Sequence, residues 1–125
     1  MPRMSSLRRL VLALMVAAAA LFATAVPAQA SWYAATVGSW TPSPGVSLRD
    51  CYHPSVNLPP NTGCTFVKSI PAGTSVRIVC QRAGQSIFSN NVWDYVVYPG
   101  GEGFVSDYYM NTGYANWIPG IDICQ

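Results

Sequence analysis

Four cysteines constrain the fold of this 125-residue chain more than any other feature of its sequence. They stand at positions 51, 64, 80 and 124, and all of them follow an N-terminal leader. A chain that is exported meets an oxidising compartment, where an even number of cysteines forms disulfide bonds. Four cysteines allow three pairings, and the spacing alone does not choose among them. We therefore expect a small domain held together by two disulfides.

The first thirty residues have the layout of a secretory signal peptide. Three arginines within the first nine residues precede an uncharged apolar run from Leu10 to Val26, and the small residues Ala28 and Ala30 then suit a signal peptidase. We expect residues 1–30 to be removed and the product to be secreted, extracellular and associated with the cell wall. No second apolar span follows, so no membrane span is expected after cleavage.

The charge of the chain changes when the leader is set aside. The whole sequence has seven basic and five acidic residues, but three of the basic residues belong to the leader, which leaves four against five and a net charge of −1. This balance argues against a nucleic-acid partner. A single histidine and scattered acidic residues do not supply a set of convergent metal ligands, so neither a metal nor another cofactor is expected.

Short runs rich in β-branched and aromatic residues recur after position 45, separated by Gly and Pro. Such runs indicate strands. The expected strands are VSLR (46–49), TFVKSI (65–70), TSVRIVCQ (74–81), VWDYVVY (92–98) and FVSDYYM (104–110), the last of which is expected to end in a helical turn. Five or six short strands with tight turns predict an all-β fold, a small antiparallel barrel or sandwich. The segments 31–45 and 111–125 lie outside this pattern and are expected to be a lead-in and a tail.

Four pieces of this region occur in an order typical of one family. They are SLR (47–49), SIPAGTSVRIVCQ (69–81), NVWDYV (91–96) and GFVSDYY (103–109). Together they resemble the bacterial SH3-like (SH3b) domains of secreted and cell-envelope proteins. Two departures stand out, because Ser47 replaces the usual Asn and a long loop beginning DCYHP replaces a short Gly/Pro loop.

The resemblance implies both a fold and a function. It implies an SH3-like antiparallel barrel over 46–110, in a small secreted single-domain member whose tail is tied back by a disulfide between Cys80 and Cys124. It also implies binding rather than catalysis, with peptidoglycan or another cell-envelope component as the ligand. We therefore expect a monomeric binding module that is not an enzyme.

The stretch from Asp50 to Cys64 suggests a second possibility, because Asp50, Cys51 and His53 resemble a thiol with a base and an orienting carboxylate. A cysteine nucleophile needs a free thiolate. Twelve residues separate Cys51 from Cys64, so a disulfide between them closes easily and stabilises the fold by about 3 kcal/mol in the chain-entropy model. We expect this disulfide and no catalytic residue.

The aromatic residues point to a ligand groove. Phe66 and Phe104 are expected in the core, and strand alternation allows Trp93 to face either the core or the opposite side. The family resemblance favours the second orientation, with Val96 inward. The residues expected to line a groove for a sugar face or an extended peptide are Tyr52, His53, Trp93, Tyr108 and Tyr109.

Two other functions remain open at this point. The first is an extracellular protein–protein interaction or inhibitor protein that uses the 51–64 loop as a rigid probe. The second is a small secreted hydrolase, which needs a free thiol or a carboxylate pair among Asp94, Glu102 and Asp107. We instead expect Glu102 at a hairpin tip and Asp107 as the cap of a turn.

Overall fold

The computed structural model describes residues 31–56 and 58–125, so the predicted signal peptide lies outside the described residues. The described chain is all-β, with one short 3-10 helix, η1, at Asp107–Tyr109. The strands are β1 (Tyr33–Val37), β2 (Val46–Asp50), β3 (Thr65–Ile70), β4 (Ser75–Ile87), β5 (Asn90–Tyr98), β6 (Gly101–Ser106), β7 (Met110–Asn111) and β8 (Asp122–Ile123).

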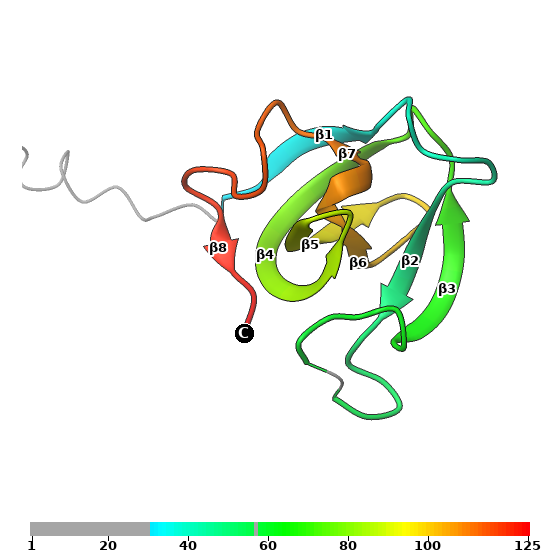
Figure 1. Ribbon diagram of the computed structural model, residues 1–125, viewed down its shortest axis with the longest axis vertical. Helices are drawn as coiled ribbons and strands as arrows, with labels where there is room; N and C mark the ends of the chain where they lie inside the picture. Colours follow the sequence, from blue (N-terminus) through cyan, green and yellow to red (C-terminus); the bar gives the residue numbers. More distant parts are fainter. Residues whose placement is uncertain (1–30, 57) are drawn as a thin grey trace, which may run out of the picture. The chain divides into compact units, whose positions relative to one another are not determined.

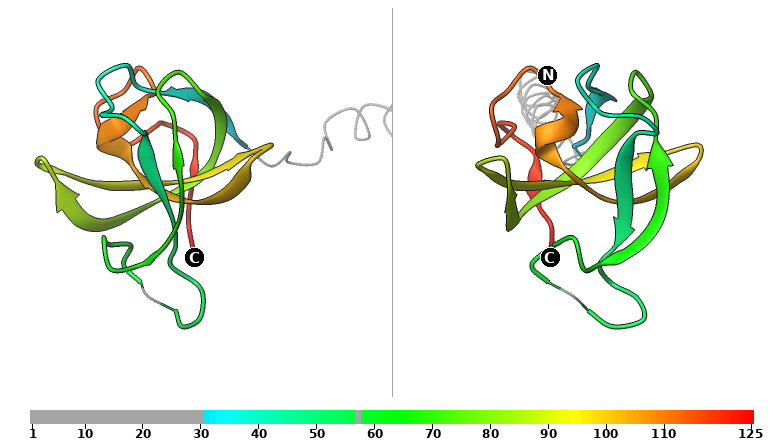
Figure 2. Two further views of the ribbon diagram at one scale, coloured as in Figure 1. Left: turned by 90° about the vertical axis from the view of Figure 1, so that its right-hand side faces the viewer. Right: turned by 45° about the vertical axis from the view of Figure 1, so that its right-hand side comes forward.

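These strands form one eight-stranded sheet in the order β3-β2-β6-β5-β4-β1-β7, with β8 beside β4 (Figure 1). Every neighbouring pair is antiparallel except β4 and β8. Figure 2 shows that the long strands bend strongly and curl the sheet around its interior. Hydrogen bonding does not close the circle, because the path ends at β3 and β7. The described chain therefore forms a curled open sheet of eight strands and not the expected closed barrel of five or six.

Two of the additional strands, β1 and β8, lie in the segments that the sequence placed outside the pattern. The third, β7, begins at Met110, because η1 interrupts the expected strand 104–110. In the lead-in, β1 pairs with β4 and β7, and its Ala35 and Val37 side chains are buried. In the tail, β8 pairs with β4. Alanine and short pairings give weak strand signals, so only the partner strands make these segments part of the sheet.

A register shift changes the pattern of the central strand. The sequence predicts that Ile78 and Cys80 share one face of β4 and that Gln81 lies on the other. The pairing with β5 shifts between Ile78 and Cys80, and Gln81 is buried whereas Cys80 is only partly buried. An irregularity of this kind reverses the side to which the following residues point, so the predicted alternation is wrong beyond Val79.

The two faces of β5 and β6 support two separate clusters. Asp94 pairs with Val105 and Tyr95 pairs with Phe104, so alternate residues point to opposite sides. On one side is the aliphatic core, whose buried members are Ala35, Val37, Val46, Leu48, Ile70, Val76, Ile78, Val96, Val105, Met110 and Ile118. On the other side is the disulfide cluster, formed by buried Cys51, Cys64, Trp93, Phe104 and Cys124 with partly buried Tyr52, Leu58, Cys80, Ile87 and Tyr95.

Both predicted disulfides are present, Cys51–Cys64 and Cys80–Cys124. Of the two phenylalanines expected in the core, Phe104 is fully buried but Phe66 is exposed. The placement of Phe66 was wrong because β3 is an edge strand, and a register shift between Leu48 and Arg49 separates Phe66 from the buried end of the strand at Ile70.

Candidate ligand-binding site

Trp93 is not an open wall of a groove. It lies on the face opposite Val96, but the disulfide cluster covers that face and leaves only 2% of the residue exposed. Its indole Nε1 donates a hydrogen bond to the Gln85 carbonyl over 2.9 Å. Trp93 is therefore mainly a packing residue, and its truncation would disturb the fold before it could report on a ligand.

A small cavity of about 170 Å³ does bring two of the five predicted groove residues together. It is lined by Val46, Ser47, Arg49, Thr62, Ile87, Trp93, Ser106 and Tyr109. Tyr52, His53 and Tyr108 do not line it. The predicted groove is thus divided among different places, and a cavity of this size holds only a small group.

Tyr52 and His53 lie at the start of the 51–64 loop. The Tyr52 ring packs 5.6 Å from Phe104 and 6.0 Å from Tyr95, and its hydroxyl donates to the carbonyl of Gln125. The His53 side chain is 83% exposed, and its Nδ1 lies 3.2 Å from Asp50 Oδ2. Tyr52 therefore packs against the disulfide cluster, whereas His53 is free to face solvent.

The Asp50 carboxylate organises the loop start rather than a catalytic site. Its Oδ1 accepts hydrogen bonds from the backbone N–H groups of Tyr52 at 2.8 Å and His53 at 3.0 Å. The hydrogen bond from Tyr52, together with those from His53, lowers the pKa of Asp50. Burial acts in the opposite direction and raises this pKa, but by less than the hydrogen bonds lower it. Cys51 is bonded to Cys64 and is not a thiol. The stretch that resembled a reactive thiol is an Asx-type turn at the base of a cross-linked loop.

The two tyrosines of η1 belong to a different aromatic group. Tyr108 lies 5.0 Å from Tyr109 and 4.9 Å from Phe88, measured between ring centroids. Phe88 is at the tip of the β4–β5 hairpin and has a positive φ of 47°. The hairpin tip thus packs against η1, and neither tyrosine contacts the 51–64 loop through a ring pair in the described chain.

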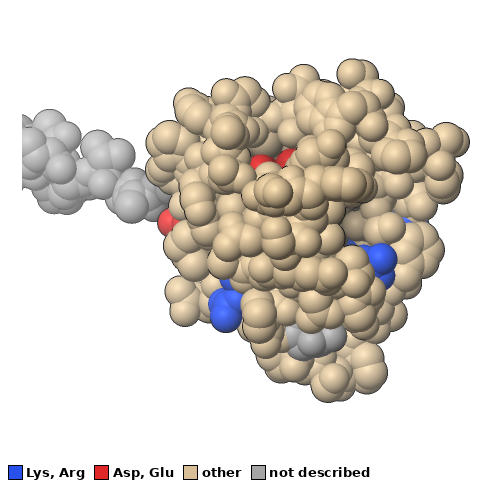
Figure 3. Space-filling view, in the orientation of Figure 1, with Lys and Arg blue, Asp and Glu red and all other residues tan. Residues whose placement is uncertain are grey.

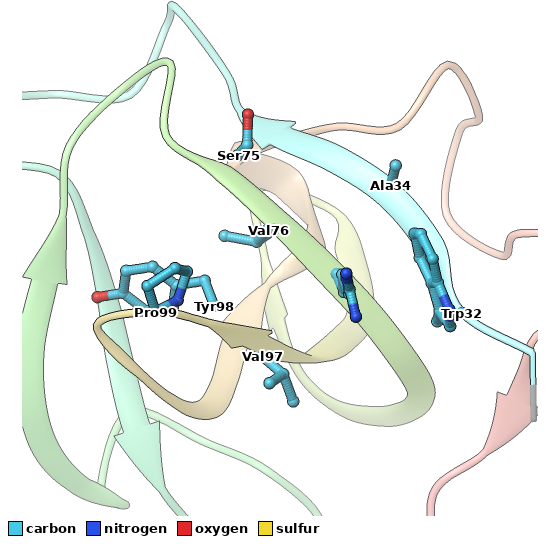
Figure 4. Close-up of a pocket in the computed structure, with 8 residues that line it drawn as sticks. Trp32, Ala34, Ser75, Val76, Val97, Tyr98 and Pro99 are labelled. Carbon is cyan, nitrogen blue, oxygen red and sulfur yellow. The ribbon is translucent and has the colours of Figure 1, made fainter.

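A cavity of about 460 Å³ lies elsewhere, between β1, the start of β4 and the end of β5. Figure 4 shows Trp32 on one side of this cavity and Tyr98 and Pro99 on the other, with Val76 and Val97 between them. The complete lining is Trp32, Ala34, Ser75, Val76, Arg77, Val97, Tyr98 and Pro99. We call it the Trp32 cleft.

The Trp32 cleft combines an apolar surface with one fixed cation. Trp32 is 50% exposed, and the Arg77 guanidinium carbon lies 4.4 Å from the centre of its ring. A guanidinium that stacks on an indole keeps its N–H donors at the edge, where they can reach a ligand oxygen. The cleft can therefore hold a ring or side chain against Trp32 while Arg77 contacts a carboxylate or another oxygen.

Sequence reasoning missed this site because it depends on the pairing of β1 with β4. Ala34 stands opposite Arg77 in that pairing, which brings the preceding Trp32 beside the arginine. The sequence alone predicts only that Trp32 covers an end of the barrel. The alternation in the segment 32–37 was the available signal, since Trp32 and Ala34 share one face of the strand and Tyr33 and Ala35 share the other.

The described chain is thus a small all-β unit with two disulfides and several surface cavities. No helix in the described part of the chain is long and apolar enough to cross a membrane. No protein-family model matches the sequence. The chain is 32% identical over 120 residues to the Bacillus subtilis (strain 168) protein named "Uncharacterized protein YraI", and the match covers 88% of this chain and 91% of that protein. The chain belongs to the family of YraI.

Proposed function

We propose that this protein is a secreted, non-catalytic binding protein that holds peptidoglycan or another cell-envelope ligand in the Trp32 cleft. The observation that carries the proposal is the half-exposed Trp32, stacked with Arg77, at the mouth of a cavity of about 460 Å³. Ligand sites are typically concave and mostly apolar, with a few polar groups that orient the ligand. The Trp32 cleft has this composition.

The chemistry of the cleft favours a wall glycan or wall peptide over a purely apolar ligand. An indole face suits the C–H face of a sugar or an extended side chain, because it offers a large rigid area at low entropic cost. The Arg77 guanidinium provides donors for carboxylate groups, which wall peptides and acidic sugars carry. Lys68 and Arg49 do not line the cleft, so Arg77 is the basic residue that sets its preference.

The proposal includes the SH3-like architecture and an extracellular location. The order of the four SH3-like sequence pieces and the curled antiparallel sheet support the first. The two disulfides and the leader-like N-terminal sequence support the second. An envelope ligand is the partner that a small exported binding module would encounter.

Retention on purified cell walls tests the proposal. Wild type should be pelleted with the walls, and Trp32→Ala or Arg77→Ala should weaken retention by about tenfold, which corresponds to roughly 1.4 kcal/mol. Trp117→Ala is the matched control, because Trp117 is a comparably exposed tryptophan at 43% and does not line the cleft. No retention of wild type, or equal retention of all variants, would contradict the proposal.

A second candidate function is protein–protein interaction through the 51–64 loop. Cys51–Cys64 pins the ends of the loop, and Val56 within it is 72% exposed. An exposed apolar side chain on a constrained loop loses little conformational freedom when a partner binds. The double substitution His53→Ala with Val56→Ala leaves the Trp32 cleft intact. Loss of binding in that variant alone would favour the loop over the cleft.

A further inference from the structure

Two carboxyl groups meet inside the protein at a place that the proposed function does not use. Asp94 on β5 is fully buried, and Asp107 at the start of η1 is only 4% exposed. Asp107 was expected to cap a turn, but the cap residue of η1 is Ser106 and no side chain caps it by a hydrogen bond. Glu102 is exposed on β6 and does not join the two aspartates.

Each carboxyl group is held by one side-chain amide. Gln81 Nε2 donates to Asp94 Oδ1 over 2.8 Å, and Asn90 Nδ2 donates to Asp107 Oδ2 over 2.9 Å. The other oxygens, Asp94 Oδ2 and Asp107 Oδ1, are buried and accept no hydrogen bond from a donor in the described residues. A proton shared between the two carboxyl groups gives both oxygens a partner.

The electrostatics agree with a shared proton. Burial raises the pKa of Asp94 well above its ordinary value, and the hydrogen bond with Asp107 and the charge of that group raise it further. The amide of Gln81 has a smaller opposing effect on the pKa of Asp94. Asp94 therefore keeps a proton at pH values where an ordinary aspartate has lost it.

The part of the chain that the structure describes offers the two aspartates no basic partner. Within the described residues, the single ion pair is His53 with Asp50, and neither Asp94 nor Asp107 has an arginine, lysine or histidine partner. Charges that are taken out of water are normally paired, because desolvation of an isolated charge costs several kcal/mol. The pair is therefore suited to a cation from outside the chain.

Asp107 is accessible from a cavity with an aromatic rim. The cavity has a volume of about 320 Å³, and Asp107 and Asn90 line it together with Trp40, Tyr108 and Tyr114, which are exposed aromatic residues. Figure 3 shows acidic atoms at the bottom of a hollow, near the place where Figure 1 draws β7 and the segment that follows it. The Trp40 indole donates to the Tyr108 carbonyl over 2.8 Å, which fixes part of the rim.

We propose that this cavity binds a ligand through a primary ammonium group, which contacts the Asp107 carboxylate between the aromatic side chains of the rim. An ammonium group has three N–H donors for carboxylate and carbonyl oxygens, and aromatic faces attract cations. No group of three or more histidine, cysteine, aspartate or glutamate residues able to hold a metal ion occurs in the described chain. The site therefore suits an organic ammonium better than a metal ion.

This inference is independent of the proposed envelope binding. The ammonium site and the Trp32 cleft share no lining residue, so either can fail without the other. An amine-bearing peptide or amino sugar could engage the ammonium site whether or not the Trp32 cleft holds a wall ligand.

A titration with n-butylammonium chloride, followed by backbone and indole N–H chemical shifts at constant ionic strength, tests the proposal. We expect saturable shifts that are largest for Asn90, the segment 108–116 and the Trp40 indole, with a dissociation constant in the millimolar range. Sodium chloride at the same ionic strength should not reproduce them. Absence of saturable shifts at these positions, or a response to calcium chloride with none to the ammonium ion, would overturn the proposal.

Two isosteric variants make the test specific to the cavity. Asp107→Asn removes the carboxylate that lines the cavity and should weaken binding at least tenfold, whereas Asp94→Asn keeps that carboxylate and should still bind. Asp122→Asn is an exposed control and should behave as wild type. Equal affinity of Asp107→Asn and wild type would contradict the proposal. If Asp107→Asn does not fold, Tyr114→Ala replaces it in the test. This variant should bind the ammonium ion about threefold more weakly than wild type, and an unchanged affinity would contradict the proposal.

Discussion

The aliphatic core and the disulfide cluster occupy opposite faces of the same two strands, yet they are built in different ways. The aliphatic core has eleven buried residues, which come from strands β1 to β7 and the C-terminal segment, and none of them is aromatic or a cysteine. The disulfide cluster has five buried residues, of which three are half-cystines and two are the aromatic residues Trp93 and Phe104. One cluster is formed by strand alternation and the other by cross-linked loops.

This difference shows how a small domain gains a second buried face. A sheet of this size can bury one side with its own strands, while the other side would normally face solvent. Here the 51–64 loop and the C-terminal segment cover the second side, and the disulfides anchor both coverings. Trp93 is buried because of those coverings.

Removal of the longer disulfide should give the largest loss of stability. Cys80 and Cys124 are separated by 44 positions, and the double variant Cys80→Ala/Cys124→Ala should lower the free energy of unfolding by about 4 kcal/mol in the chain-entropy model. Cys51 and Cys64 are separated by 13 positions, and the double variant Cys51→Ala/Cys64→Ala should lower the free energy of unfolding by about 3 kcal/mol. Urea denaturation followed by tryptophan fluorescence measures both. A smaller loss for the longer bridge would show that the loop-closure view is wrong here.

A cavity in the aliphatic core should lower the free energy of unfolding about as much as removal of the shorter disulfide. The two changes should differ in their effect on the exposure of Trp93. Leu48 is fully buried among aliphatic side chains, so Leu48→Ala should lower the free energy of unfolding by about 3 kcal/mol. Trp93 should stay buried in the native state of this variant, whereas loss of Cys51–Cys64 should expose it. Acrylamide quenching under native conditions distinguishes the two. Equal quenching of both variants would mean that the clusters do not form separately.

Asp94 is a buried acidic residue on the aliphatic side of the sheet, and its replacement should stabilise the protein. Asp94→Asn keeps the shape and supplies an N–H donor for Asp107, so we expect a gain of about 1–2 kcal/mol at neutral pH. Because the folded pKa of Asp94 is raised, its stabilising contribution is complete below about pH 4 and is lost as the pH rises through the folded pKa. Thermal unfolding between pH 3 and 8 should show this decline in wild type and a flatter profile in Asp94→Asn. An unchanged profile would contradict the assignment.

The exposed ion pair between His53 and Asp50 should contribute least to the free energy of unfolding. The His53 side chain faces solvent, so His53→Ala should change the free energy of unfolding by less than about 0.5 kcal/mol. Asp50→Ala should cost more, because it removes the acceptor of two backbone N–H bonds at the loop start. Chemical denaturation of both variants at low and high salt measures the difference. A larger effect for His53→Ala would indicate that the ion pair matters more than the turn.

Several features of the fold could be predicted from local patterns. Alternation in 46–49, 65–70 and 92–98 predicted strands that the structure contains, and an even number of cysteines predicted two disulfides. These features depend on residues close in the sequence, or on a cysteine count, so no knowledge of the tertiary contacts was needed.

The candidate sites were less predictable. Trp93 and Tyr109 line one cavity together, and the other proposed groove residues do not line it. The orientation of Trp93 and the cover over it depend on the 51–64 loop and on Cys124. The Asp94–Asp107 contact was considered among three acidic residues but not singled out. Its formation depends on how β5 meets η1, which alternation within a strand does not specify.

The sequence by itself determined the all-β class, most of the strands and the presence of cross-links, because these follow from the period of the side chains and from the chemistry of paired cysteines. Only the tertiary structure decided that Trp32 stacks on Arg77, that Trp93 is buried and that Asp94 meets Asp107. Each of these depends on strand order, on register or on the course of a loop. Such contacts join residues that are distant or only loosely constrained in the sequence, and their geometry is set by the packing of the whole domain.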